Sequence, residues 1–265
     1  MDNLPITDRA AHLNRQAWDS IRRQRDQGLI DKHHNVAADI LAGKTCLTPQ
    51  HWQLAGAVSG KHLFDLGCGD GFELLEWARA GAHVVGVDNS PRQLAAAQRA
   101  ADALGVSCRL VLADLLDLPN ELLQAGFDIV FSAWVTAWIG DLPRWFHSAA
   151  AALKPGGVFL LSGRHPLAAF FAEQQRREAV RENYFQEGPF FAESDQSAAW
   201  NPSGNRYMTI EWRPTLSSIV TAVAHSGLRI THLLEVGVGD ATAKDGLPGY
   251  PEEFVVRAVK NFDQR

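Results

Sequence analysis

The feature that most constrains this chain is a glycine-rich loop that follows directly on an apolar, strand-like run. The run is His62–Leu66, and it continues into the loop as Asp65-Leu66-Gly67-Cys68-Gly69-Asp70-Gly71. Three glycines in five residues keep the backbone free of side chains where a strand leads into a helix, so a ligand can approach it closely. A tight turn without a ligand is the simpler alternative, but it does not need three glycines at this spacing. We therefore expect the loop to bind a small molecule.

Alternating β-rich and amphipathic segments place this loop in an α/β sheet. Five continuous apolar runs predict parallel strands that are covered on both faces; they are His62–Leu66, His83–Val87, Cys108–Leu112, Asp128–Phe131 and Val158–Leu161. Two further strands are expected at Leu228–Leu234 and Glu253–Val259. Helices are expected at about 72–80, 90–104, 120–125, 141–153 and 215–226. The fold class predicted is α/β, with a Rossmann-like, mostly parallel seven-stranded sheet and helices on both faces.

Two segments lie outside this alternation. Residues 1–58 begin with apolar positions at helical spacing, and we expect them to form an N-terminal helical lid segment. Residues 59–265 are expected to form the ligand-binding domain, with a cap inserted after the fifth strand at about 167–213. The cap concentrates aromatic residues in a helix-like stretch and an irregular segment. A lid over an apolar ligand and a hydrophobic seam between cap and sheet, or between two subunits, both fit this composition.

Composition narrows the classes of function. The formal net charge of −5 lacks the basic excess with which nucleic-acid binders displace phosphate counterions, so we expect no nucleic-acid partner. No apolar run reaches membrane-spanning length, which predicts no membrane partner. Cys46, Cys68 and Cys108 lack Cys-x-x-Cys spacing, which favours a reducing, cytoplasmic compartment. The adjacent His33 and His34 would diverge on a helix, and we expect no metal.

The glycine spacing and the acids of the loop also indicate which class of ligand it binds. Dinucleotide-binding loops read Gly-x-Gly-x-x-Gly and direct a helix N-terminus at a pyrophosphate. Here the third glycine comes one residue early, and the acids Asp65 and Asp70 would lie beside the negative pyrophosphate. Both acids suit a ligand that carries an ammonium and a sulfonium group. An NAD-linked oxidoreductase is therefore disfavoured.

The pattern Asp65-x-Gly67-x-Gly69-x-Gly71 resembles motif I of the class I methyltransferases that depend on S-adenosylmethionine (SAM). The resemblance covers about residues 60–165 and implies SAM as the cofactor. Asp88 matches the acid that accepts both ribose hydroxyls, and Ala113-Asp114-Leu115 matches the motif at the adenine. Asn89 stands where many members place an apolar residue against the adenine. The cofactor-binding residues implied by the resemblance are Asp65, Gly67, Cys68, Gly69, Gly71, Asp88, Asn89, Ala113, Asp114, Leu115, Ser132 and Ala133.

Candidate catalytic residues follow the fourth and fifth strands. Trp134 and Trp138 are four residues apart and would place electron-rich rings near a cation if they shared a helix face; core packing is the alternative. His165 ends the fifth strand and is a candidate base or orienting group, although a histidine beside a proline is often a strand-terminating residue bonded to backbone. The candidate catalytic residues are His165, Trp134, Tyr184 and Tyr207, with Glu187 as a weaker alternative.

The N-terminal helices of similar methyltransferases help to close the acceptor pocket. By that analogy we expect Trp18 and Arg22 to reach the site, with Arg22 meeting a carboxylate of the acceptor; solvated surface is the alternative for Arg22. The loop after the fourth strand also lacks the Asn-Pro-Pro-Tyr or Asp-Pro-Pro-Tyr sequence of the amino-methylating nucleic-acid branch. The resemblance is therefore to small-molecule enzymes.

The function predicted is in-line O-, N- or C-methylation of a small, apolar or aromatic metabolite, in secondary metabolism, by a monomer or homodimer. A SAM-consuming cyclase or lyase that yields methylthioadenosine is an alternative in a different reaction class. A non-catalytic SAM-binding or interaction module is another, and an oligomer interface formed by Trp134, Trp200 and Tyr207 would favour it.

Overall fold

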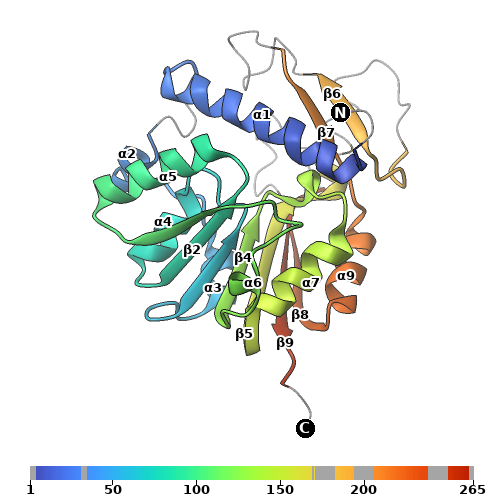
Figure 1. Ribbon diagram of the computed structural model, residues 1–265. Helices are drawn as coiled ribbons and strands as arrows, with labels where there is room; N and C mark the ends of the chain where they lie inside the picture. The colour runs from blue at the N-terminus through green and yellow to red at the C-terminus, as the bar shows by residue number, and fades with distance from the viewer. Residues whose placement is uncertain are drawn as a thin grey trace.

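A seven-stranded sheet in the order β3-β2-β1-β4-β5-β9-β8 forms the centre of the protein (Figure 1). The computed structural model describes residues 4–30, 35–168, 170, 183–193, 206–237 and 250–262. The strands are β1 (His62–Leu66), β2 (His83–Asp88), β3 (Cys108–Leu112), β4 (Phe127–Ala133), β5 (Leu153–Arg164), β8 (Leu228–Gly237) and β9 (Pro251–Lys260). β9 runs antiparallel to both of its neighbours, and the other pairings are parallel. The predicted fold class is confirmed, and each predicted strand is present.

Helices cover both faces of this sheet (Figure 1). The helices described are α1 (Ile6–Asp26), α2 (Val36–Leu41), α3 (Pro49–Ala55), α4 (Phe72–Arg79), α5 (Pro91–Leu104), α6 (Asn120–Leu123), α7 (Leu142–Ala152) and α9 (Leu216–His225), with a 3-10 turn, η1, at Thr136–Trp138. On β1, Phe64 packs into the core beneath α6, α7 and α9, whereas the neighbouring Leu63 packs into the core beneath α3 and α4. Because successive strand residues face opposite sides, both must be apolar when both faces are covered.

Local sequence explains where the helices that flank the site begin. The Ser90 side chain accepts a hydrogen bond from the Gln93 N–H, and Pro91 occupies the first turn, so α5 starts directly after β2. Gly71 adopts φ +83° at the start of α4, where a β-carbon would come within 2.8 Å of the Ala97 β-carbon on α5. The loop between β1 and α4 is therefore closely packed against α5.

Beyond β5 the chain forms a small second sheet. It consists of β6 (Phe190–Glu193) and β7 (Met208–Glu211), which pair antiparallel. The sequence predicts an irregular segment here, so these strands are a difference from the prediction. α1 lies across the carboxyl ends of the main strands and contacts β7 (Figure 1). Most of the helix-like stretch expected after residue 167, and Trp200, lie outside the described residues.

Candidate functional site

The three glycines of the loop differ in what a β-carbon would contact at each position. A β-carbon on Gly67 would lie 2.6 Å from Cγ2 of Val135, and one on Gly71 would meet Ala97. These two glycines are therefore required by packing. Gly69 also has a positive φ, of +53°, but a β-carbon there would meet nothing within 4 Å. Its position borders open space, as expected for a loop whose backbone faces a ligand.

Asp88, at the end of β2, joins the glycine loop to α5. Its Oδ2 accepts a hydrogen bond from the Gly69 N–H at 3.0 Å, and its Oδ1 accepts one from the Ser90 N–H at 2.8 Å. Burial raises the pKa of this carboxyl to about 6, although the two backbone N–H groups favour its charged form. Each carboxylate oxygen has two lone pairs, so both retain capacity to accept a hydroxyl group.

Asp65, on β1, is a buried acid whose carboxyl pKa is strongly raised. The side chain is 2% exposed, and burial, followed by the charges of Glu73 and Asp88, raises the pKa of its carboxyl well above the usual range. Within the described part of the chain, no hydrogen-bond partner is found for this carboxyl. A cation placed beside Asp65 would favour its ionised form.

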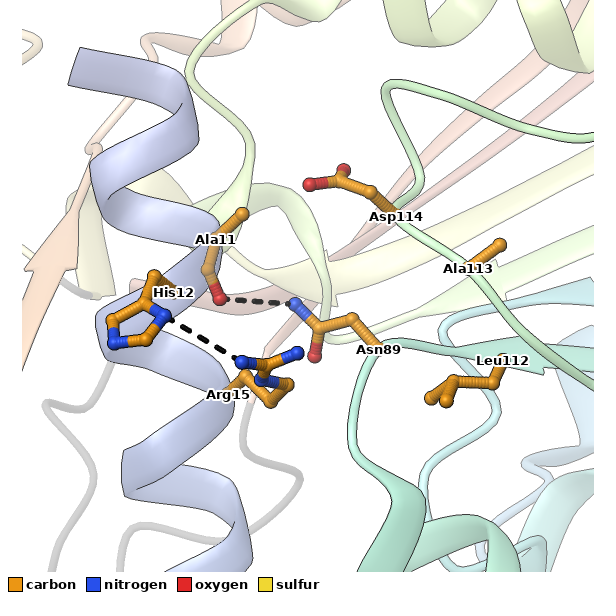
Figure 2. Close-up of a pocket in the computed structure, with 7 residues that line it drawn as sticks. All are labelled: Ala11, His12, Arg15, Asn89, Leu112, Ala113 and Asp114. Carbon is orange, nitrogen blue, oxygen red and sulfur yellow. Dashed lines mark hydrogen bonds between the residues drawn. The ribbon is translucent and has the colours of Figure 1, made fainter. Parts of the chain in front are cut away.

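A cavity of about 320 Å³ opens between α1 and the ends of β2 and β3 (Figure 2). Its walls are formed by Ala11, His12, Arg15, Asn89, Leu112, Ala113 and Asp114. The structure thus brings together three of the predicted cofactor-binding residues, Asn89, Ala113 and Asp114. The Asn89 Nδ2 donates to the Ala11 carbonyl at 3.4 Å, and Asp114 Oδ1 accepts the Leu116 N–H at 2.8 Å. The resemblance to SAM-dependent methyltransferases implies a nucleoside at Asn89 and Asp114, and we therefore call this space the nucleoside cavity.

The remaining predicted cofactor residues support the loop. Ser132 is buried, and its hydroxyl donates to the Leu66 carbonyl at 2.6 Å, which ties the end of β4 to the end of β1. Cys68 is buried, and burial raises the pKa of its thiol. Leu115 lies against Gly67, and Ala133 is half-buried at the end of β4.

Two arginines of α1 form ion pairs with the glycine loop. Arg22 and Arg25 are buried, and their Nη1 atoms lie 3.3 Å and 2.9 Å from Oδ2 of Asp70. The alternative of a solvated Arg22 is wrong, because the side chain is buried and pairs with Asp70 and Asp26. Its contact with an acceptor carboxylate stays a prediction. The sequence also places Asp70 beside a cationic ligand, but its carboxylate binds these two arginines instead.

Two further polar contacts of α1 were missed by sequence reasoning. Asn14 is buried and exchanges two hydrogen bonds with the Ile210 backbone of β7, at 2.8 Å and 2.9 Å. Asp19 accepts a bond of 2.6 Å from the Ser90 hydroxyl, at the start of α5. A signal for the first contact was available: Asn14 interrupts the apolar stripe that includes Ala10 and Ala17, and a polar residue in such a stripe needs a partner.

The two tryptophans after β4 have separate environments. Trp134 is 47% exposed and has φ +61°, a left-handed conformation that is uncommon for a non-glycine residue. Trp138 lies in η1 and packs edge-on against Trp18, with ring centroids 5.3 Å apart. Because no α-helix forms here, Trp134 and Trp138 do not share a helix face.

His165, directly after β5, has both ring nitrogens engaged. It is buried; Nδ1 accepts the Leu167 N–H at 3.1 Å, so Nε2 carries the proton and donates to Glu235 Oε1 at 2.9 Å. Its backbone N–H donates to the Glu252 carbonyl. This geometry agrees with a strand-terminating residue that is bonded to backbone, and a proton could be accepted only after one of these bonds is lost.

The cap candidates lie apart from the residues that line the nucleoside cavity. Tyr184 packs edge-on against Phe170 and lines a small hollow of about 10 Å³ with Pro166, Phe190 and Arg213, among others. Glu187 Oε1 accepts hydrogen bonds from the Thr215 backbone and from the Thr215 and Ser218 hydroxyls, so it caps α9. Tyr207 is half-buried, and burial raises the pKa of its phenol.

Metal-binding and membrane-spanning features are absent from the part of the chain that the structure describes. Among these residues, no group of three or more histidine, cysteine, aspartate or glutamate side chains is arranged to hold a metal ion. None of the helices in the same part of the chain has the length and apolar character needed to cross a membrane. His33 and His34 lie outside the described residues.

Comparison with known proteins identifies a family and relatives that this chain resembles. Residues 64–161 match the family described as "Methyltransferase domain". The ubiquinone biosynthesis O-methyltransferase of Rhodopseudomonas palustris (strain BisB5) is 35% identical over 107 residues, which are 40% of each chain. The enzyme of the same name from Bordetella avium (strain 197N) is 29% identical over 71% of this chain and 86% of its own. The chain thus matches about 40% of the length of the first of these relatives.

The fold is shared with solved structures. One is the crystal structure of a SAM-dependent methyltransferase from Methanosarcina mazei, with a TM-score of 0.63 and 20% sequence identity over 82% of this chain and 99% of that one. At this identity the likeness is one of fold alone.

Proposed function

We propose, on the premise that this chain belongs to the class I SAM-dependent methyltransferases, that it transfers a methyl group from SAM to an oxygen atom of a small-molecule acceptor. The observation that carries the proposal is Asp88. Its carboxylate is fixed by the glycine loop on one side and α5 on the other, next to the nucleoside cavity. A fixed carboxylate at a strand end is suited to bind a ribose diol.

The residues present fit SAM at both ends of the molecule. Asp65 is a buried acid without a hydrogen-bond partner in the described residues, which suits the ammonium group of the methionine part. Gly69 borders open space, so its backbone is accessible. Asn89, Ala113 and Asp114 line a cavity large enough for part of a small ligand. When bound, SAM supplies an electrophilic methyl group on a positively charged sulfur.

The protein's part in the reaction is to orient the acceptor and exclude water. In-line methyl transfer already has a good leaving group, so positioning accounts for much of the acceleration. Trp134 is our candidate for a wall of the acceptor site, because its exposed ring stands on a backbone held in a left-handed conformation after β4. His165 is assigned an orienting role, since both of its ring nitrogens are engaged.

The choice of oxygen follows the relatives, which are named O-methyltransferases. An acceptor hydroxyl that is ionised near neutral pH would need no dedicated base. Tyr184 and Tyr207 remain candidates for contacts in the cap, as does an apolar or aromatic acceptor. A lid role for residues 1–58 and a role in secondary metabolism remain predictions, as does the choice between monomer and homodimer.

The experiment is a binding and product assay. We expect S-adenosylhomocysteine to bind in isothermal titration calorimetry, and SAM labelled in the methyl group to transfer label to a panel of phenols and carboxylic acids. The co-product distinguishes the reactions: S-adenosylhomocysteine indicates methyl transfer, and methylthioadenosine indicates the cyclase or lyase alternative. Absence of S-adenosylhomocysteine binding would refute the proposal.

A matched pair of glycine variants adds a control. Gly69→Leu fills the open space beside the loop, and Gly105→Leu makes the same change at the end of α5, where φ is +65° and a β-carbon also meets nothing within 4 Å. Both variants carry similar backbone strain. We expect only Gly69→Leu to abolish S-adenosylhomocysteine binding, and equal loss in both would contradict a direct role of Gly69.

We propose that the protein acts in the cytoplasm. We also propose that its acceptor is a small molecule and that it has no nucleic-acid partner. The supports for these proposals are the free thiols of Cys46, Cys68 and Cys108 and the net charge of −5. Addition of duplex DNA at low salt tests the last point, because a nucleic-acid enzyme would show a salt-dependent complex.

A further inference from the structure

The nucleoside cavity has a charged wall that belongs to α1. His12 and Arg15 line it from this helix, and Arg15 extends towards Asn89 (Figure 2). The Arg15 side chain is exposed, and Nη2 meets His12 Nδ1 at 3.5 Å, which is the outer limit of a hydrogen bond. The guanidinium plane is therefore held only weakly by the protein.

The opposite wall is apolar. Leu112, at the end of the edge strand β3, is 57% exposed although it is a large aliphatic residue, and Ala113 follows it. Beside them, Asp114 uses Oδ1 to accept the Leu116 N–H, and among the described residues its Oδ2 has no hydrogen-bond partner. A flat ring with amino groups on its edge would meet an apolar surface at Leu112 and an acceptor at Asp114.

Asn89 links two walls of the cavity. Its amide donates to the Ala11 carbonyl of α1, so it tethers the helix at the end of β2 (Figure 2). Arg15 is one turn further along α1 and lines the same cavity. His12 is a second planar group of α1 at this cavity, but both of its ring nitrogens meet side chains of the same helix, Arg15 and Gln16. The planar group that extends from α1 towards Asn89 is the guanidinium of Arg15 (Figure 2). Such a group stacks on aromatic faces and attracts their π-electrons.

We propose that Arg15 binds the cofactor by stacking its guanidinium on the adenine ring, which makes α1 part of the cofactor site. This inference rests on the proposed function and extends it to a specificity-determining residue. Charge supports the assignment: the positively charged part of SAM is matched by Asp65 on β1, whereas Arg15 stands at the ends of β2 and β3. Arg15 therefore contacts the neutral adenine and leaves the methyl-bearing end to other residues.

The test compares two ligands that share the adenosine part. S-adenosylhomocysteine and 5′-methylthioadenosine are titrated by calorimetry into the full chain and into Arg15→Ala. We expect the variant to weaken both by a similar factor, about threefold to thirtyfold. Arg23→Ala, on the exposed face of α1, is the matched control and should bind both ligands as the unmodified protein does.

Each other result overturns the inference. Unchanged binding of both ligands to Arg15→Ala excludes an adenine contact, and a loss confined to S-adenosylhomocysteine places Arg15 at the amino-acid end. Full affinity in Arg15→Lys, which keeps the charge but has no plane, rules out stacking. Failure of the unmodified protein to bind S-adenosylhomocysteine refutes the proposed function itself. Equal thermal unfolding of the variants without ligand shows that they are folded.

Discussion

At the scale of single residues, the site depends on where acids are buried. Asp65 and Asp88 both have a raised carboxyl pKa, chiefly because burial removes their charged forms from water. Asp88 and Asp70 differ in their hydrogen-bond and ion-pair partners. Asp88 accepts two backbone N–H bonds, whereas Asp70, which directly follows Gly69, is paired with two arginines. Asp88 therefore keeps room for a ligand, and the charge of Asp70 is used within the protein.

The proposed contact between Asp88 and the ribose diol predicts that ligand affinity depends on pH. A ribose diol donates to the ionised carboxylate, and protonation removes part of that acceptor capacity. Because the pKa of Asp88 in the free protein is about 6, affinity for 5′-methylthioadenosine should be constant above about pH 7 and fall as the pH drops through about 6. Calorimetric titrations between about pH 5 and pH 8 measure this.

The control for that prediction is Asp88→Asn, which cannot titrate. We expect weaker binding with a flat profile over the same pH range. A profile for the unmodified protein that is also flat would show that Asp88 does not meet the diol. The ligand is chosen because 5′-methylthioadenosine lacks the ammonium group assigned to Asp65, so the second acid does not contribute.

At the scale of elements, α1 is held by polar contacts to three separate segments. Asn14 meets β7, Asp19 meets the start of α5, and Arg22 with Arg25 meets the glycine loop. Each contact joins groups that are largely removed from water. Buried polar groups cost stability when a partner is lost, so these contacts specify one position for the helix.

The ion pairs of α1 predict that Asp70 and Asp26 contribute differently to the free energy of unfolding. Asp70→Asn leaves the buried Arg22 and Arg25 without their shared counter-charge and should cost about 3–5 kcal/mol of unfolding free energy. Asp26→Asn removes an acid that is 37% exposed and should cost less than about 1 kcal/mol. Urea denaturation measures both, and equal costs would contradict the importance of burial here.

Sequence patterns predicted the elements of the main sheet well, because both-face burial leaves long apolar runs such as those of β1 and β5. Motif spacing also located Asn89 and Asp114, which both line the cavity, since strand ends meet at one edge. The partners of α1 were not predictable in this way. Arg22 meets a residue 48 positions away, and no local pattern records such a contact. The strands β6 and β7 are too short for alternation to be distinctive.

At the scale of the whole molecule, α1 connects the small sheet of β6 and β7 to the nucleoside cavity. The same helix binds β7 through Asn14 and lines the nucleoside cavity through Ala11, His12 and Arg15. A change at the β7 contact should therefore alter ligand binding at the cavity, although Asn14 does not line it. Figure 1 shows α1 spanning this distance above the sheet.

Asn14→Leu tests this connection. The change leaves the Ile210 N–H and carbonyl without their partner and should cost about 1–3 kcal/mol of unfolding free energy. We also expect weaker S-adenosylhomocysteine binding, because the helix that forms one cavity wall is less firmly held. Arg23→Leu, an exposed change on the same helix, is the control. Destabilisation without any loss of affinity would show that the cap and the cavity are independent.

The long-range contacts of α1 also set an order of events during synthesis. The helix is synthesised before its partners: Asp70 follows Arg25 by 45 residues, Ser90 follows Asp19 by 71 and Ile210 follows Asn14 by 196. At about 5–20 residues per second, Asn14 waits roughly 10–40 s for its partner to be made. The helix that forms one wall of the nucleoside cavity therefore gains its β7 contact only after residue 210 has been translated.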